Sequence, residues 1–196
     1  GSYEFFDFAS KGQVNGAMAA RSPGSALKPF VYALALDEGL ITPESLLYDV
    51  PVDYAGYRPV NYDGSYHGYV TAREALANSL NVPAVNLYAQ LGNDSIYSFL
   101  KRAGISTLTE PQAHYGLSLV LGGCGVTLLE LTTLYAGLAN FGEFAPYQLT
   151  MEDGEKESGS RRAEEQGRKG DKEARRQGDK ATHAIRNTQY AIRNTQ

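Results

Sequence analysis

Ser25 and Lys28 have the residue types and the spacing of a serine nucleophile and its base. The turn residues Pro23-Gly24 precede them, and the apolar run Phe30–Leu40 that follows predicts a helix. Residues three apart lie on one helical face, so the lysine amine can reach the serine hydroxyl. A serine hydroxyl becomes an effective nucleophile when a neighbouring base removes its proton. The pair therefore predicts nucleophilic catalysis at the start of a helix.

Lysine can act as this base only if its pKa falls toward neutrality. Removing the amine from water lowers its pKa, and the apolar neighbours Leu27, Phe30 and Val31 supply such surroundings. The unpaired backbone N–H groups in the first turn of the helix would favour negative charge that develops near Ser25. The local sequence thus fits both steps of the chemistry.

The spacing of Ser25 and Lys28 is weak evidence by itself, because it recurs at Ser98 and Lys101. The second pair lies within a predicted helix over 95–103, where a serine and a lysine are most simply solvated surface residues. By the same reasoning, Ser25 alone is compatible with an N-cap serine that precedes an exposed lysine. The rest of the sequence has to decide between these interpretations.

The elements that position these residues are predicted to be mostly helices within residues 1–150, where turn residues separate apolar runs. Helix starts are predicted at Thr42-Pro43-Glu44, at two capping boxes (Thr71 to Glu74 and Thr127 to Glu130), and at Asp94 for a helix that stops at Gly104.

One of these helices, Thr127–Phe141, is apolar on almost all sides and precedes Gly142. This pattern predicts a buried helix with a glycine C-cap. The best candidates for short strands are Tyr3–Ala9 and Leu117–Leu121.

The composition excludes several classes of function. Residues 1–150 carry 7 Lys+Arg against 13 Asp+Glu, and residues 151–196 carry 11 against 9, so neither part has the positive excess that binds nucleic acid. Cys124, the single cysteine, excludes a disulfide framework and a multi-thiolate metal site, and we expect it to be a small buried residue. The histidines lack ligand spacing, so we expect no metal. No apolar run approaches the length of a transmembrane helix.

From Glu152 onward the sequence contains no Leu, Val, Phe or Met, and Gly, Glu, Lys, Arg and Gln dominate. Such a segment cannot bury enough apolar area to offset its chain entropy, so residues 151–196 are predicted to be a disordered low-complexity tail. The hexapeptide AIRNTQ occurs twice, at 184–189 and at 191–196. We favour readthrough into repeated non-coding DNA as its origin; a natural flexible tail is the alternative, and two units are too few for a coiled coil.

Three blocks of the sequence resemble the class A penicillin-binding proteins, especially the 1C type, in the order that this family has. They are GQVNGAMAARSPGSALKPF (12–30), REALANSLNVPAVNL (73–87) and YGLSLVLGGCGVTLLELTTLYAGLANFG (115–142). The second block contains the Ser-x-Asn motif of the family as Ser79-Leu80-Asn81. The resemblance covers nearly all of residues 3–147. Three long blocks in order are far more specific than either short motif.

The resemblance implies an α+β fold of the penicillin-binding and β-lactamase-like serine transpeptidase type, here truncated to a mostly helical part with an incomplete sheet. It implies that Ser25 attacks the carbonyl between the two terminal D-alanines of a peptidoglycan stem peptide and that Lys28 takes the serine proton. Ser79 would relay a proton to the departing D-alanine, and Asn81 would bind the amide backbone of the substrate. Without the resemblance, Ser79 and Asn81 are compatible with a helix C-terminal pair before Pro83.

The family has a third motif, Lys-Thr/Ser-Gly, which holds the terminal carboxylate of the substrate from a strand of the central sheet. No such tripeptide occurs in the sequence, and the resemblance ends near Pro146–Gln148. We therefore expect residues 1–150 to be a partial transpeptidase domain that, within these 196 residues, turns over no stem peptide.

Two other functions share part of this pattern. A serine β-lactamase also has the Ser-x-x-Lys start, but the Glu-x-x-x-Asn segment that would deliver water follows the second motif, whereas Glu74 and Asn78 precede Ser79. A catalytically dead remnant, or a module that only binds peptidoglycan or a partner protein, agrees with the missing third motif. The retained Ser25, Lys28, Ser79 and Asn81 argue against selection for binding alone, although a recently broken gene would keep them too.

The resemblance also implies β-lactam antibiotics as ligands and requires no cofactor. The absence of an initiator Met suggests that the chain begins inside a longer protein. By resemblance, the intact protein would carry a membrane anchor and a glycosyltransferase domain, and would act on the outer face of the bacterial cytoplasmic membrane, in the periplasm where an outer membrane exists.

Overall fold

The structure, a computed structural model, describes residues 4–9 and 11–147 of the chain. In these residues, helices dominate and one antiparallel sheet has two strands. The elements follow in the order η1 (Gly24–Leu27), α1 (Lys28–Asp37), β1 (Leu46–Asp49), β2 (Gly68–Thr71), α2 (Ala72–Ala77), α3 (Asn81–Leu91), α4 (Asn93–Arg102), α5 (Gln112–Tyr115), η2 (Gly116–Leu121) and α6 (Leu128–Ala139), where η marks a 3₁₀ helix. This architecture agrees with the expected helix-rich α+β fold.

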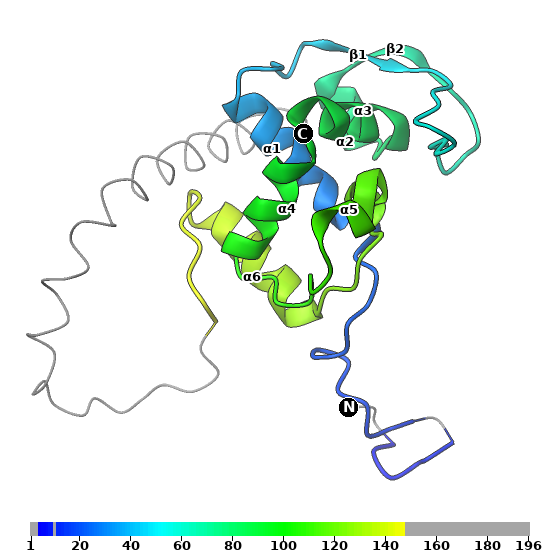
Figure 1. Cartoon of the computed structure of the whole chain (residues 1–196). Helices are drawn as coiled ribbons and strands as arrows, with labels where there is room; N and C mark the ends of the chain where they lie inside the picture. Colours follow the sequence, from blue (N-terminus) through cyan, green and yellow to red (C-terminus); the bar gives the residue numbers. More distant parts are fainter. Residues whose placement is uncertain (1–3, 10, 148–196) are drawn as a thin grey trace, which may run out of the picture.

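Helices α1 and α3 form the centre of the core (Figure 1). Both are apolar on most sides, and Phe30 and Val31 of α1 and Val85 and Leu87 of α3 are fully buried. Helix α4 and the 3₁₀ helix η2 pack against this pair. Because η1 runs directly into α1, the core also fixes the segment that carries Ser25.

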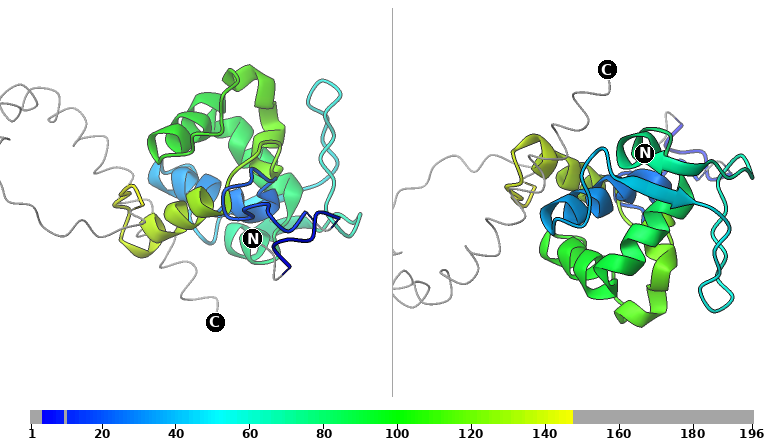
Figure 2. Two further views of the ribbon diagram at one scale, coloured as in Figure 1. Left: turned by 90° about the horizontal axis from the view of Figure 1, so that it is seen from below. Right: turned by 90° about the horizontal axis from the view of Figure 1, so that it is seen from above.

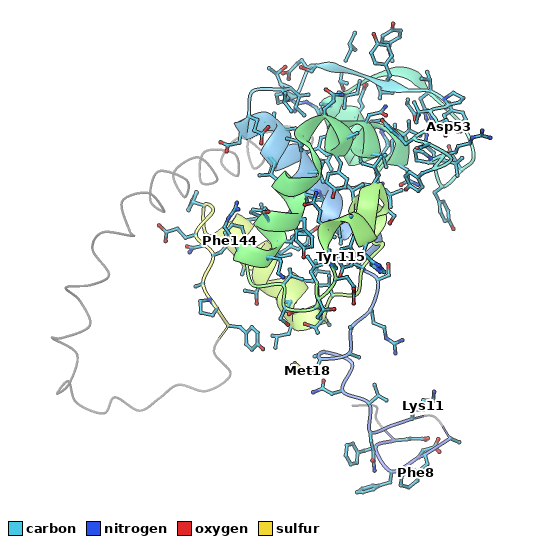
Figure 3. The ribbon with its side chains drawn as sticks, viewed as in Figure 1. Phe8, Lys11, Met18, Asp53, Tyr115 and Phe144 are labelled. Carbon is cyan, nitrogen blue, oxygen red and sulfur yellow. The ribbon has the colours of Figure 1, made fainter. Side chains whose placement is uncertain are left out.

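The two-stranded sheet lies across α2 and α3 (Figure 2, right). Its strands pair with Leu47 opposite Val70 and Tyr48 opposite Tyr69. Side chains alternate along β1, so that Leu47 is buried and Tyr48 is exposed. The long loop between the strands, which contains Asp53, projects to one side of the helices (Figure 3). Sequence reasoning did not anticipate this hairpin.

Both predicted capping boxes are confirmed. The Thr71 side chain accepts a hydrogen bond from the Glu74 N–H, and the Glu74 carboxylate accepts one from the Thr71 N–H, at the start of α2. Thr127 and Glu130 make the same reciprocal pair at the start of α6. Each box satisfies N–H groups that have no partner inside the helix.

Other local predictions were wrong. Residues 42–45 form a turn rather than a helix start, because the Ser45 N–H donates to the Thr42 carbonyl before β1 begins. Helix α4 begins at Asn93, with Gly92 at the N-cap, so Asp94 lies inside the helix. The run 117–121 forms η2 rather than a strand, since a short apolar run does not distinguish the two. Residues 4–9 contain turns and no strand, and Tyr3 lies outside the described residues.

Helix α6 is only partly buried, in contrast to the prediction. It ends at Ala139 with Asn140 at the C-cap, before Gly142, and its Leu134 is fully buried. On the other side, Leu128 is 59% exposed and Tyr135 is 39% exposed. An apolar composition predicts that other protein elements cover a helix. It does not predict that those elements lie within the described residues.

The segment before Ser25 extends away from the helices and carries Phe8, Lys11 and Met18 (Figure 3). It joins the folded part through the Arg21–Val126 bridge, whose backbone groups exchange hydrogen bonds of 3.0 and 2.8 Å. The predicted tail over 151–196 lies outside the described residues. None of the described helices is both long and apolar enough to cross a membrane.

Candidate active site

Ser25 is the second residue of η1, and its side chain is exposed. Gly24 before it has φ +55°, a left-handed conformation that suits glycine. The Lys28 N–H donates to the Ser25 carbonyl, which closes a 3₁₀ turn. In such a turn, side chains three residues apart lie above one another. The backbone therefore brings residues 25 and 28 close together, and the reach of the lysine amine to the serine hydroxyl stays a prediction.

The glycine-rich segment after η2 packs against the turn that carries Ser25. The Ser22 hydroxyl donates to the Gly122 carbonyl at 2.7 Å. A Cβ on Gly122 would lie 2.4 Å from the Gly24 nitrogen, and Gly122 has φ +86°. Only glycine fits this close approach, so two distant parts of the chain together determine where the nucleophile segment lies.

The Lys28 side chain is almost fully buried, at 1% exposure. Its Nζ donates to the Ser79 carbonyl at 2.5 Å, to Asn81 Oδ1 at 2.6 Å and to Ser79 Oγ at 3.2 Å. Lys28, Ser79 and Asn81, to which the family resemblance gives roles in one reaction, therefore meet in the structure, across 51 and 53 residues of sequence.

Burial lowers the pKa of the Lys28 amine from 10.5 to about 8. The cause is the loss of hydration, which penalises the charged form. All three acceptors around Nζ are uncharged oxygens. The amine can therefore lose its proton near neutral pH, which a general base requires.

Ser79 directly follows Asn78, the C-cap residue of α2, and its φ is +54°. A non-glycine residue in this region carries strain, which the surrounding hydrogen bonds must hold. The Ser79 N–H donates to Leu76 O and the Leu80 N–H donates to Ala75 O. The resulting tight connection brings two oxygens of Ser79 to the Lys28 amine.

Asn81 is the first residue of α3. Its Nδ2 donates to the Val60 carbonyl at 2.7 Å, which leaves its Oδ1 for Lys28. The interpretation of Ser79 and Asn81 as a helix C-terminal pair holds for Ser79, which follows the C-cap of α2, but not for Asn81, which is the first residue of α3.

A hollow of about 540 Å³ opens beside Ser79. Asn78 and Leu80 line one side, and residues of the β1–β2 hairpin, including Tyr62, His67 and Tyr69, line the other. Sequence reasoning missed these hairpin residues, because nothing in their spacing shows that they pair back onto the Ser-x-Asn segment. Of the four predicted site residues, only Ser79 lines this hollow.

The structure separates this site from the other candidates. The Ser98–Lys101 pair lies on α4, and Lys101 is exposed with its Nζ 5.6 Å from the centre of the Tyr97 ring. Cys124 is half-buried rather than buried, and burial raises the pKa of its thiol to about 11. Among the described residues, no group of His, Cys, Asp and Glu side chains has the geometry of a metal site.

Comparisons with known proteins identify the family of this chain. The family described as "Penicillin binding protein transpeptidase domain" matches residues 8–195. Penicillin-binding protein 1C of Escherichia coli (strain K12) is 42% identical over 153 residues, which are 78% of this chain and 20% of that protein. The chain spans about a fifth of the length of the curated relatives that it matches.

Two solved structures share the fold. Penicillin-binding protein 1A of Haemophilus influenzae has a TM-score of 0.60 at 32% identity, over 70% of this chain and 21% of that one. Penicillin-binding protein PonA1 of Mycobacterium tuberculosis has a TM-score of 0.61 at 26% identity, over 68% of this chain and 38% of that one. The sequence match and the fold lead to one conclusion: the chain belongs to the penicillin-binding protein transpeptidase family.

Proposed function

We propose that the protein containing this chain is a serine D,D-transpeptidase that cross-links peptidoglycan stem peptides, with Ser25 as the nucleophile and Lys28 as its base. The observation that carries the proposal is the buried Lys28 amine, which has a pKa near 8, contacts Ser79 and Asn81, and follows Ser25 by one 3₁₀ turn. At pH 7 about one-tenth of such amines are neutral, enough to supply a base.

In the proposed reaction, Ser25 Oγ attacks the carbonyl carbon between the terminal D-alanines while its proton passes to Lys28 Nζ. The peptide C–N bond breaks, and Ser79 relays a proton to the departing D-alanine amine, which leaves an ester on Ser25. The amine of a neighbouring stem peptide then attacks this ester, and the serine oxygen recovers a proton. Asn81 binds the amide backbone of the substrate through its side chain. β-Lactams would acylate the same serine.

The proposed place of action is the outer face of the bacterial cytoplasmic membrane, since the relatives are class A penicillin-binding proteins. We further propose that residues 1–150 form part of the transpeptidase domain and that 151–196 form a separate segment. A polypeptide of these 196 residues contains no Lys-Thr/Ser-Gly motif, so on its own it should turn over no stem peptide. In the family, the strand that carries this motif also helps form the oxyanion hole, and removing one oxyanion-hole donor alone costs about 3 kcal/mol of transition-state stabilisation.

For a polypeptide of these 196 residues alone, the second candidate is a catalytically dead remnant, or a module that only binds peptidoglycan or a partner protein, because these residues contain no Lys-Thr/Ser-Gly motif. A β-lactamase is less well supported, because the Glu74 carboxylate is engaged in the α2 capping box and those hydrogen bonds lower its pKa.

The decisive experiment joins residues 1–147 to the Lys-Thr-Gly-containing region of a class A relative and measures covalent labelling by a fluorescent penicillin. We expect stoichiometric labelling at Ser25, found by peptide mapping, and none in Ser25→Ala. Ser98→Ala is the matched control, since it alters the same spacing on the surface of α4 and should leave labelling intact. A folded chimera that is labelled elsewhere, or not at all, refutes the proposal in favour of the remnant.

A further inference from the structure

Asp49 is a buried carboxylate that the proposed mechanism does not use. It ends β1 and is 0% exposed. Asn61 Nδ2 donates to both of its oxygens at 2.8 Å, and Oδ2 also accepts from the His67 N–H at 2.9 Å and meets His67 Nδ1 at 2.7 Å. A buried charge costs free energy unless it is well hydrogen-bonded. The β1–β2 hairpin therefore holds the Asp49 carboxylate next to Asn61, with hydrogen-bond partners for both of its oxygens.

Asn61 joins this carboxylate to the start of α3. Its side chain is buried, at 3% exposure, and its Oδ1 accepts from the Asn81 N–H at 2.8 Å and more weakly from the Val82 N–H at 3.4 Å. The first N–H groups of a helix have no partner within it. Leu80 occupies the N-cap and has no side-chain oxygen to offer. An asparagine from a distant loop thus caps α3.

The same loop holds the other end of Asn81. Val60, the neighbour of Asn61, accepts the Asn81 Nδ2 donor at 2.7 Å, while Asn81 Oδ1 accepts from Lys28 at 2.6 Å. With its backbone N–H and its side-chain amide both anchored, Asn81 can present only its oxygen to the amine. A continuous chain of hydrogen bonds therefore runs from Asp49 through Asn61 and Asn81 to Lys28.

We propose that Asn61, fixed by Asp49, is a positioning residue of the active site that sets the orientation of Asn81 and, through it, of the Lys28 amine. The inference rests on the proposed function for its catalytic meaning, although the contact chain itself does not. Asn61 touches none of the groups assigned to bond making, so its effect passes entirely through Asn81.

Asn86 provides a matched control on the same helix. Its Oδ1 accepts from the Tyr54 hydroxyl and its Nδ2 donates to the Tyr48 carbonyl, so it also ties α3 to the hairpin with a side-chain amide. It lies more than one turn beyond Asn81 and makes no contact with Lys28. A merely structural link between hairpin and helix would make the two asparagines equivalent.

The test measures how fast acetic anhydride acetylates Lys28, by mass spectrometry, relative to the exposed Lys101 of the same molecule. In Asn61→Ala the Lys28 to Lys101 ratio should rise about fivefold, the factor that corresponds to one net hydrogen bond. In Asn86→Ala the ratio should stay at the value of the unmutated chain. An unchanged ratio in Asn61→Ala, or an equal rise in both variants, overturns the positioning role.

A second variant exchanges the two side chains, Asp49→Asn together with Asn61→Asp. The new amide at 49 can donate to the new carboxylate at 61, which can accept the Asn81 and Val82 N–H groups at the helix N-terminus, where negative charge is favourable. The exchange removes the hydrogen bond from position 61 to the Ser65 carbonyl, one of the two contacts between positions 49 and 61, and the carboxylate beside His67 Nδ1. We expect the slow acetylation of Lys28 to return; a folded exchange variant with rapid acetylation contradicts the inference.

Hydrogen exchange on the unmutated chain completes the test if variants fail to fold. The Asn81 N–H should be protected although it begins a helix, and rapid exchange there would overturn the inference. The results of these tests are distinguishable from the results that test the proposed function. Normal Ser25 labelling in the chimera with an unprotected Lys28 refutes only the positioning role, whereas a protected Lys28 without Ser25 labelling refutes only the transpeptidase assignment.

Discussion

Lys28 keeps its amine inside the protein with only neutral oxygens as hydrogen-bond partners. Within the described residues, no carboxylate forms an ion pair with it. Loss of hydration therefore acts without compensation by an opposite charge, and the pKa of the amine falls to about 8. The same environment that makes Lys28 a usable base makes its charged form costly to the folded state.

This cost predicts a dependence of stability on pH. The pKa of Lys28 is about 8 in the folded protein and 10.5 as its ordinary value, so between these pH values the unfolded chain binds more protons. The free energy of unfolding should then rise with pH across this window, by at most about 1.4 kcal/mol per pH unit. Urea unfolding of the unmutated chain and of Lys28→Met at about pH 7.5 and about pH 9.5 measures it.

The comparison that tests this is the change in the free energy of unfolding with pH in the unmutated chain minus that in Lys28→Met. The subtraction is needed because other groups make the folded protein less stable as pH rises. Burial raises the pKa of Cys124 and of Tyr54, so the folded state holds their protons longer and loses stability as pH rises. Lys28→Met shares these groups. If the unmutated chain gained nothing over Lys28→Met between the two pH values, the environment described for Lys28 would be wrong.

The left-handed backbone of Ser79 leads to a second prediction at this scale. With φ at +54°, alanine would keep the strain and glycine would relieve it. Both variants lose the hydroxyl that contacts Lys28. The difference between their free energies of unfolding therefore reports the backbone strain at position 79. Ser79→Gly should be more stable than Ser79→Ala by about 1 kcal/mol in urea unfolding. Equal stabilities would contradict a left-handed backbone at the start of the Ser-x-Asn segment.

Among the elements, η1 and η2 depend on each other through a close approach of Gly24, the first residue of η1, and Gly122, the C-cap residue of η2. Gly122→Ala combines backbone strain at φ +86° with a Cβ 2.4 Å from the Gly24 nitrogen. Gly39→Ala is the matched control, since Gly39 has φ +70° and open space around its Cβ position. We expect about 1 kcal/mol of destabilisation in Gly39→Ala and about 1–3 kcal/mol more in Gly122→Ala.

Urea unfolding checks this pair of variants, and the accessibility of the Ser25 segment to protease gives a second readout. The nucleophile turn should loosen in Gly122→Ala and stay intact in Gly39→Ala. A loss of stability that is the same in both variants would show that the contact between the two 3₁₀ helices does not hold the turn.

Local sequence signals predicted the elements that depend on local contacts. The capping boxes at Thr71 and Thr127 and the turn before Ser25 involve residues a few positions apart, and all three are present. The β1–β2 hairpin was missed, because it pairs strands far apart in the sequence whose short apolar runs resemble other loops. For the same reason the sequence did not reveal Asn61, whose partners lie on β1 and α3.

At the scale of the whole molecule, the described residues form a helical core that carries the nucleophile and the Ser-x-Asn segment and leaves apolar side chains of α6 exposed. Leu128 and Tyr135 are examples. The family resemblance implied that the Ser-x-x-Lys and Ser-x-Asn motifs belong to one active site. Neither motif alone specifies this. Which side of α6 stays open did not follow from its composition.

The motif content of the sequence predicts the behaviour of the chain alone. In a polypeptide of these 196 residues, we expect no stoichiometric covalent labelling by a fluorescent penicillin, because no Lys-Thr/Ser-Gly segment is present to hold the carboxylate. Gel fluorescence and intact mass measure the adduct. Stoichiometric labelling that disappears in Ser25→Ala would show that the two motifs present suffice for acylation.

The proposed chemistry depends on a Lys28 amine that is buried against Ser79 and Asn81 and can be neutral near physiological pH. Its most direct test is an NMR titration of the Lys28 side chain, with the exposed Lys101 as reference in the same spectra. We predict a pKa of about 8 for Lys28. A midpoint at the ordinary value of 10.5 would contradict this, because the amine would then be solvated and unable to act as the base for Ser25.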